Sequence, residues 1–151
     1  MGYISTAGAL PACIFCAALE AGDDRRAYIL HRGKLAFLIL NAYPYASGHL
    51  MAAITRHGGS FEDATAGELT EAMQLIQSAI RALRATYHPD GFNIGLNQGR
   101  VAGAGVPDHL HVHVVPRWDG DTNFMPVIGE TKVLPETLET TYGRLSATLT
   151  S

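Results

Sequence analysis

Apolar positions in the first third of the chain form short runs that predict β-strands. Residues 27–31 and 34–40 are rich in aliphatic and aromatic side chains and flank a hairpin signal at residues 32–33. A turn-rich stretch with Pro and Gly, residues 41–48, separates them from a third apolar run at residues 49–55. We therefore expect three consecutive strands before the first long helix.

A capping box at Thr65 and Glu68 predicts the start of a long helix, because these two side chains satisfy N–H groups that the first turn leaves unpaired. The helix should end at His88-Pro89, since proline cannot continue it. A second helix is predicted within residues 135–149. One helical stripe of the long helix is expected to be buried, and it consists of Leu69, Met73, Ile76, Ile80, Leu83 and Tyr87.

Two more strands are predicted on either side of a glycine-rich loop. Residues 92–96 alternate apolar and polar side chains, which indicates a half-buried strand. The loop at residues 97–107 follows, and residues 109–116 then alternate with β-branched positions. Together the elements predict one α+β domain over residues 1–151, with a mostly antiparallel sheet, one long helix, a C-terminal helix and an N-terminal arm at residues 1–25.

Composition and charge narrow the class of protein. The chain has 151 residues, of which 47% are hydrophobic and 17% charged, so it is not intrinsically disordered. A net charge of −3 argues against a nucleic-acid-binding protein. No apolar run approaches the roughly 20 residues that span a bilayer, and the N-terminal residues lack a secretory pattern. We expect a soluble cytoplasmic protein that binds neither nucleic acid nor membranes.

Three alternating histidines, His109, His111 and His113, carry the strongest chemical signal. Alternate side chains of a strand point to one face, so the three imidazoles should lie side by side. All three could hold one catalytic metal ion. Alternatively, one is a nucleophile and its neighbours orient it and bind phosphate. The glycine-rich loop before the strand favours phosphate chemistry, because glycines let backbone N–H groups approach an anion.

The two cysteines form a Cys13-x-x-Cys16 pair. Such a pair can be half of a metal site, a redox dithiol or two unremarkable thiols. The redox interpretation expects a preceding strand, which the residues before Cys13 do not predict. The metal interpretation needs two further ligands from elsewhere in the chain, so the spacing alone leaves the choice open.

The histidine strand and the segments around it resemble the histidine triad (HIT) superfamily. The stretch His109-Leu110-His111-Val112-His113-Val114-Val115 matches the family's signature of three alternating histidines without a mismatch. The residues after it, up to Phe124, resemble the branch of fragile-histidine-triad hydrolases and bacterial diadenosine tetraphosphate phosphorylases. The resemblance covers most of the chain and also includes Cys13-x-x-Cys16, Leu40-Asn41, Ser47-Gly48-His49, Arg56-His57 and Pro116-Arg117-Trp118.

The resemblance implies that His111 attacks the α-phosphorus of a nucleotide and forms a nucleotidyl-histidine intermediate. His113 would then bond the phosphate or the leaving oxygen, and Phe15 and Ile39 would contact the base. Gly105 departs from the family, because many of its hydrolases carry Gln or Ser there, and this leaves the acceptor (water or inorganic phosphate) open. The nucleotide-binding and phosphate-binding residues that the resemblance implies are Asn41, Asn97, Gln98, Gly103, Ala104, Gly105, His113 and Trp118.

Zinc-bearing members of the superfamily use residues that correspond here to Cys13, Cys16, His57 and His109. Two thiolates and two imidazoles form a closed tetrahedral set, which is typical of structural zinc. The family also implies a homodimer joined through the long helix and a sheet edge. Of the remaining histidines, His31 is expected at the surface and His88 at a helix C-terminus, whereas His49 is a candidate for the edge of the active site.

The function predicted from the sequence is nucleotidyl hydrolysis or transfer, with dinucleoside polyphosphates such as diadenosine tetraphosphate as substrates. A nucleoside phosphoramidase uses the same intermediate with an amine leaving group and is the nearest competing hypothesis. Two hypotheses from different functional classes are a purine-nucleotide-binding module with little turnover and a metalloenzyme with the three histidines on one ion.

Overall fold

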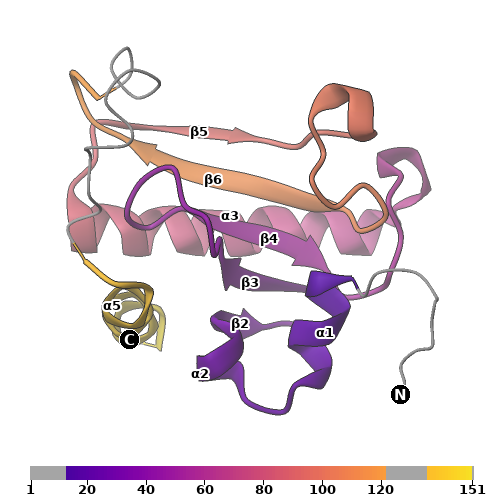
Figure 1. Ribbon diagram of the computed structural model, residues 1–151, viewed down its shortest axis with the longest axis horizontal. Coiled ribbons are helices and arrows are strands. Elements are labelled where there is room, and N and C mark those ends of the chain that lie inside the picture. Colours follow the sequence, from indigo (N-terminus) through magenta and orange to yellow (C-terminus); the bar gives the residue numbers. More distant parts are fainter. Residues whose placement is uncertain (1–12, 122–135, 151) are drawn as a thin grey trace.

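The computed structural model describes residues 13–121 and 136–150, which build an α+β fold around a five-stranded sheet (Figure 1). All neighbouring strands are antiparallel, and their order is β2-β3-β4-β6-β5. The predicted fold class is therefore confirmed. The strands are β2 (Ile29–Arg32), β3 (Ala36–Leu40), β4 (Leu50–Ile54), β5 (Gly91–Gly95) and β6 (His111–Arg117).

The long helix α3 (Ala66–Tyr87) has the predicted boundaries. Thr65 accepts a hydrogen bond from the Glu68 N–H, and Glu68 accepts one from the Thr65 N–H, so the capping box is present. The helix ends at Tyr87, and the capping residue His88 adopts a left-handed conformation with φ of 53°. The other helical elements are α1 (Ile14–Glu20), α2 (Asp24–Ala27), α5 (Leu138–Thr150) and the 3₁₀ turns η1 (Phe61–Asp63) and η2 (Arg100–Ala102).

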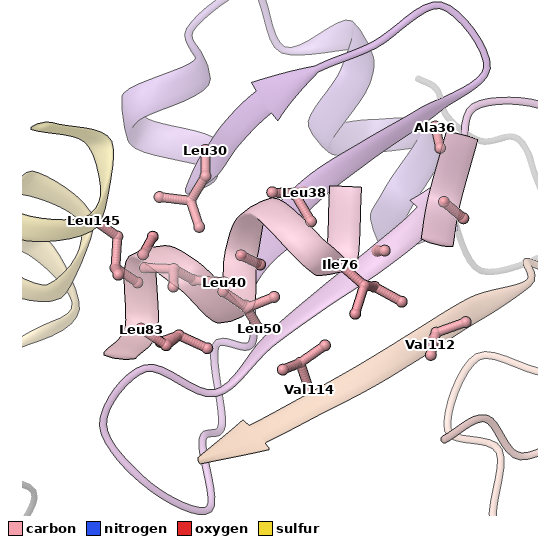
Figure 2. Packing of buried hydrophobic residues seen from close by; sticks show 14 of the residues in the cluster. Leu30, Ala36, Leu38, Leu40, Leu50, Ile76, Leu83, Val112, Val114 and Leu145 are labelled. Atoms are coloured by element: carbon pink, nitrogen blue, oxygen red, sulfur yellow. The ribbon is translucent and has the colours of Figure 1, made fainter. Parts of the chain in front are cut away.

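The larger core fills the space between one face of the sheet and the helices α3 and α5. Figure 2 shows Leu38, Leu50 and Val114 of the sheet pointing towards Ile76 and Leu83 of α3. The predicted stripe of α3 is only partly correct, because Met73 is 45% exposed. Small side chains are buried in its stead, since Ala72, Ala79 and Ala82 of α3 belong to the larger core.

The opposite face of the sheet carries a second cluster around Phe15 of α1. Phe37 and Ile39 of β3 and Met51 and Ala53 of β4 pack with it. The histidine strand β6 runs beside β4, with His111 opposite Ala53 and His113 opposite Met51. Because Val112 and Val114 point into the larger core, His111 and His113 share the face that α1 covers.

The predicted strands match the structure to within two residues at each end. The first begins at Ile29 rather than residue 27, because α2 precedes it and Tyr28 makes the turn with φ of 63°. The strand predicted to be half buried, β5, lies at the edge of the sheet, so Ile94 is 48% exposed. The Glu71 carboxylate of α3 accepts hydrogen bonds from the N–H groups of residues 35 and 36, which fixes the β2–β3 hairpin.

Within residues 13–121 and 136–150, no helix combines the length and the apolar character that crossing a membrane requires. Three sequence-based predictions fall partly outside these residues. They concern the first part of the N-terminal arm, the family-like stretch that ends at Phe124, and the beginning of the second helix at Pro135.

Candidate active site and metal group

The three histidines lie in one row of rings against Phe15. The ring of Phe15 is 5.1 Å from His109 and 4.8 Å from His111, and His111 is 5.0 Å from His113. His109 comes just before β6, whereas the other two are within it. The predicted arrangement on one face is therefore what the structure shows.

His111 has one ring nitrogen fixed by the backbone and the other left as an acceptor. Its Nδ1 lies 2.8 Å from the His109 carbonyl oxygen, and because a carbonyl only accepts, Nδ1 carries the proton. The neutral ring then has a lone pair on Nε2. Burial lowers the pKa of His111, and the hydrogen bond to the carbonyl partly offsets that effect. The ring is therefore a neutral base at physiological pH.

His49 fixes the tautomer of His113. The Tyr45 N–H can only donate, and it lies 3.1 Å from His49 Nδ1, so a neutral His49 carries its proton on Nε2. That Nε2 lies 3.0 Å from His113 Nδ1 and donates to it. A neutral His113 is consequently protonated on Nε2, which presents an N–H group next to His111.

Burial keeps both members of this pair uncharged. The ring of His49 is 1% exposed, and burial first and the neighbouring His113 second lower the pKa of His49 to about 4. Burial, together with His111, also lowers the pKa of His113. His49 and His113 are therefore neutral imidazoles. Their hydrogen-bonding roles are set by the backbone N–H at Tyr45 rather than by charge.

The residues implied to contact the nucleoside lie on the same face of the sheet. Ile39 packs in the cluster around Phe15. Asn41 follows β3, and its Nδ2 lies 3.4 Å from His49 Nε2. The Asn41 Oδ1 accepts the Tyr43 N–H at 2.8 Å, which orients the amide. The structure thus brings Phe15, Ile39 and Asn41 near the histidines.

Several backbone N–H groups of the glycine-rich loop donate hydrogen bonds to carbonyls within the loop itself. The N–H groups of Gly103 and Ala104 donate to the carbonyls of Arg100 and Gly99, respectively, because residues 100–102 form the turn η2. The Gly105 N–H has no acceptor among the described residues, and a Cβ at this position would meet no atom within 4 Å. The Gly105 N–H is therefore one that a ligand can reach.

Three other predicted contact residues, Asn97, Gln98 and Trp118, differ in where the structure places them. The Gln98 side chain bonds the Phe61 N–H and the Glu62 carboxylate. Asn97 is exposed and faces Gly103. Trp118 follows the far end of β6, seven residues after His111, which corresponds to roughly 23 Å along a strand. The Gln98 amide is thus engaged by residues 61–62, and Trp118 lies beyond the far end of β6. Asn97, in contrast, follows β5 by two residues, at the end where Gly95 lies opposite His113 of β6.

Cys13, Cys16, His57 and His109 form one group whose four ligand atoms all lie within 4.8 Å of one another. Cys13 Sγ lies 3.3 Å from His109 Nδ1, and Cys16 Sγ lies 3.4 Å from His57 Nδ1 and 3.6 Å from His109 Nδ1. The predicted ligand set is thus brought together from three separate parts of the chain. His111 and His113 do not belong to it.

The group fits a tetrahedral zinc ion. Zinc–sulfur and zinc–nitrogen bond lengths place neighbouring ligand atoms about 3.6 Å apart at the tetrahedral angle, close to the distances observed. His109 Nε2 lies 2.6 Å from the Ile54 carbonyl oxygen, to which it donates, so Nδ1 is free to bind metal. Such a bond to the second ring nitrogen is a regular feature of metal-binding histidines.

The loop that carries His57 is held on both sides. The Arg56 guanidinium makes two hydrogen bonds of 2.9 Å to the buried carboxylate of Glu68 in the capping box of α3. The Leu110 N–H donates to the Gly58 carbonyl at 2.7 Å. Arg56, Glu68 and Tyr45 support the site but could not be predicted from the sequence. Arg56 and Glu68 pair across twelve residues, and Tyr45 acts through its backbone N–H.

Comparisons with known proteins agree with this geometry. The HIT domain family matches residues 24–120. The AP-4-A phosphorylase of Mycobacterium tuberculosis H37Rv is 48% identical over 126 residues, which cover 83% of this chain and 64% of that protein. The adenosine 5′-monophosphoramidase of Saccharomyces cerevisiae is 30% identical over 108 residues, which cover 72% of this chain and 64% of that protein.

Among solved structures, a zinc-bound histidine triad family protein from Mycobacterium smegmatis is similar over 92% of this chain and 94% of its own. The TM-score is 0.75 and the sequence identity 26%. The present chain thus spans a similar structure almost completely, but only about two thirds of the length of the phosphorylase.

Proposed function

The chain belongs to the HIT family, and on that basis we propose that it is a nucleotidyl hydrolase or transferase with His111 as its nucleophile. The observation that carries the proposal is the state of the His111 ring. Its Nδ1–H is bonded to the His109 carbonyl, so the unprotonated Nε2 is available for attack. The similarity to the AP-4-A phosphorylase from M. tuberculosis supports dinucleoside polyphosphates as the substrate class.

In the proposed first step, the His111 Nε2 lone pair forms a bond to the α-phosphorus of the substrate. The bond from phosphorus to the bridging oxygen breaks, and the leaving polyphosphate takes its electron pair. The His113 Nε2–H, which His49 orients, donates a hydrogen bond to that oxygen and stabilises its developing charge. The intermediate is a nucleotidyl group on His111, and covalent catalysis divides the reaction into two easier displacements.

The second step transfers the nucleotidyl group to an acceptor. Inorganic phosphate would yield ADP and ATP from diadenosine tetraphosphate, whereas water would yield AMP and ATP. Gly105 supports a backbone contact to phosphate, because its N–H has no acceptor among the described residues. We propose that Asn41, Ile39 and Phe15 hold the nucleoside and that Asn97, which follows the strand end beside His113, contacts the phosphate chain. Gln98 and Trp118 are weaker candidates, because the Gln98 amide is bound to residues 61–62 and Trp118 follows the far end of β6.

Product analysis tests this proposal. Diadenosine tetraphosphate is incubated with and without inorganic phosphate, with the His111→Ala variant as the blank. Formation of ADP and ATP only with phosphate identifies a phosphorylase, and formation of AMP and ATP without it identifies a hydrolase. Release of neither pair by the wild type, or equal release by His111→Ala, would contradict the proposal.

A phosphoramidase is the second candidate, favoured by the similarity to the yeast adenosine 5′-monophosphoramidase. The same His111 intermediate would form with an amine as the leaving group. Assay of adenosine 5′-phosphoramidate beside diadenosine tetraphosphate separates the two, because the specificity constants kcat/KM can be compared directly. A nucleotide-binding module would instead bind AMP and turn over neither compound.

We also propose that Cys13, Cys16, His57 and His109 hold one structural zinc ion. The distances within the group and the bond from His109 to the Ile54 carbonyl support this. When bound, the metal would tie α1 and the loop after β4 to the start of the histidine strand. The zinc-bound relative from M. smegmatis adds independent support for the metal.

A homodimer and a cytoplasmic location complete the proposal. The exposed Met73 of α3 and Ile94 of the edge strand β5 offer apolar surface for a partner copy. The two cysteines carry no disulfide, as is usual in a reducing compartment. Light scattering after size-exclusion chromatography would give a mass near twice 16.2 kDa for a dimer, and a mass of one chain would contradict it.

A further inference from the structure

A continuous row of rings connects the buried face of the sheet with the surface. It begins at Phe15, passes His111 and His113, and continues to His49 at 5.2 Å from His113. It ends at Tyr45, whose ring lies 5.3 Å from that of His49 at an interplanar angle of 12°. The last contact is therefore a nearly parallel stack.

The Tyr45 ring is covered on one side only. The ring of His49 lies against one of its faces, yet the residue is 71% exposed. The Tyr45 backbone is itself anchored, because its N–H donates to His49 Nδ1. A flat aromatic face that is held in place and open to solvent is the feature on which nucleobases stack, since every base offers a π-face.

We propose that Tyr45 is the stacking platform for the second nucleoside of a dinucleoside polyphosphate. This inference rests on the proposed nucleotidyl transfer at His111. The first nucleoside is assigned to the Phe15 end of the ring row, so the two bases would occupy opposite ends. The phosphate chain would pass over His111 and His113, which lie between them.

The direction of the reaction supports this placement. A displacement at phosphorus expels the leaving group on the side opposite to the attacking nitrogen, which is away from the sheet that carries His111. The second nucleoside therefore leaves on the side away from the sheet. Tyr45 is exposed and lies two ring contacts from His113, a separation that a polyphosphate chain can span. Tyr45 would thus favour substrates with two nucleosides over substrates with one.

The test compares diadenosine tetraphosphate with adenosine 5′-tetraphosphate, which has the same phosphate chain but a single nucleoside. Calorimetry measures the Kd of both nucleotides for the His111→Asn protein, with and without Tyr45→Leu. We expect Tyr45→Leu to weaken binding of the dinucleotide about tenfold and binding of the mononucleotide less than about twofold, given the strength of base stacking on aromatic rings. Tyr45→Trp should retain the preference.

Tyr43→Leu is the matched control, because Tyr43 is on the same loop and is 90% exposed but is not part of the ring row. It should change neither Kd. Equal weakening of both nucleotides by Tyr45→Leu would overturn the proposal, since Tyr45 would then act only by holding His49. Unchanged binding of both, or no measurable binding of either, would also overturn it.

Turnover by the wild-type protein separates this inference from the proposed function. The wild type could cleave neither nucleotide while Tyr45→Leu weakens only the binding of the dinucleotide. That result would support Tyr45 as the stacking platform and contradict the proposed nucleotidyl transfer. The wild type could instead cleave both nucleotides, with Tyr45→Leu lowering kcat/KM for both to the same extent. That result would support nucleotidyl transfer and contradict the role of Tyr45 as a stacking platform.

Discussion

Acidification from pH 7 to pH 5 is expected to destabilise the protein through His49. Its ring is 1% exposed, and burial and His113 lower its pKa from 6.5 to about 4. The unfolded chain therefore takes up a proton on this side chain below about pH 6.5, whereas the folded chain resists protonation until about pH 4. The stabilisation from a neutral His49 is fully present above pH 6.5 and is lost as the pH falls towards 4.

The size of this effect follows from the shift. One pKa unit corresponds to about 1.4 kcal/mol, so the whole contribution is about 3 kcal/mol. Linkage gives about 2 kcal/mol for the part that is lost between pH 7 and pH 5. The groups that face the ring are His113 from β6 and Asn41 and Tyr45 from the loop after β3. None of these supplies a negative charge that would stabilise a protonated His49.

Urea unfolding at pH 7 and pH 5 measures the effect in the wild type and in His49→Gln. Glutamine stays neutral at both pH values, so the wild type should lose about 2 kcal/mol more stability than the variant. Protonation of the metal ligands is common to both proteins and cancels in this comparison. His31→Gln, which replaces an exposed histidine of β2, is the control and should behave as the wild type. Losses that agree within about 0.5 kcal/mol in wild type and His49→Gln would show that burial of a neutral His49 does not control the acid sensitivity.

Three further changes test the packing and the metal group. Leu83→Ala removes a fully buried side chain of the larger core and should cost about 3 kcal/mol in urea unfolding, and a loss below about 1 kcal/mol would contradict the packing. Gly48→Ala should cost about 2 kcal/mol in the same assay, because φ is +89° and the new Cβ would lie 2.8 Å from a Leu83 methyl carbon, so an unchanged stability would count against this turn. Elemental analysis should find about one zinc per chain in protein purified without chelator and much less in Cys13→Ser. Equal zinc in both proteins would exclude Cys13 as a ligand.

Helix-capping and strand-alternation patterns in the sequence were sufficient to predict most of the fold. The capping box located the start of α3 to the residue, and alternation placed His111 and His113 on one face of β6. The face of α3 was less predictable, because both Met73 and Ala72 suit a helix. Only the way α3 packs against the sheet decides that Ala72 is buried and Met73 is exposed.

The candidate site was predictable where the signal lies in residue type and spacing. Cys13, Cys16, His57 and His109 meet as expected, although they come from three parts of the chain. The tautomer of His113 was not predictable, since it depends on a backbone N–H at Tyr45 that reaches His49. For the same reason the sequence did not reveal that the Gln98 amide is bound to the loop at residues 61–62.

Detection of the covalent intermediate on His111 would test nucleotidyl transfer most directly. The protein is mixed with diadenosine tetraphosphate, quenched within one turnover, and its intact mass and peptides are determined by mass spectrometry. We expect a chain that is heavier by one adenylyl group, with the label on the peptide that contains His111, and no label in His111→Ala. Turnover without any labelled chain, or a label that persists in His111→Ala, would show that His111 is not the nucleophile.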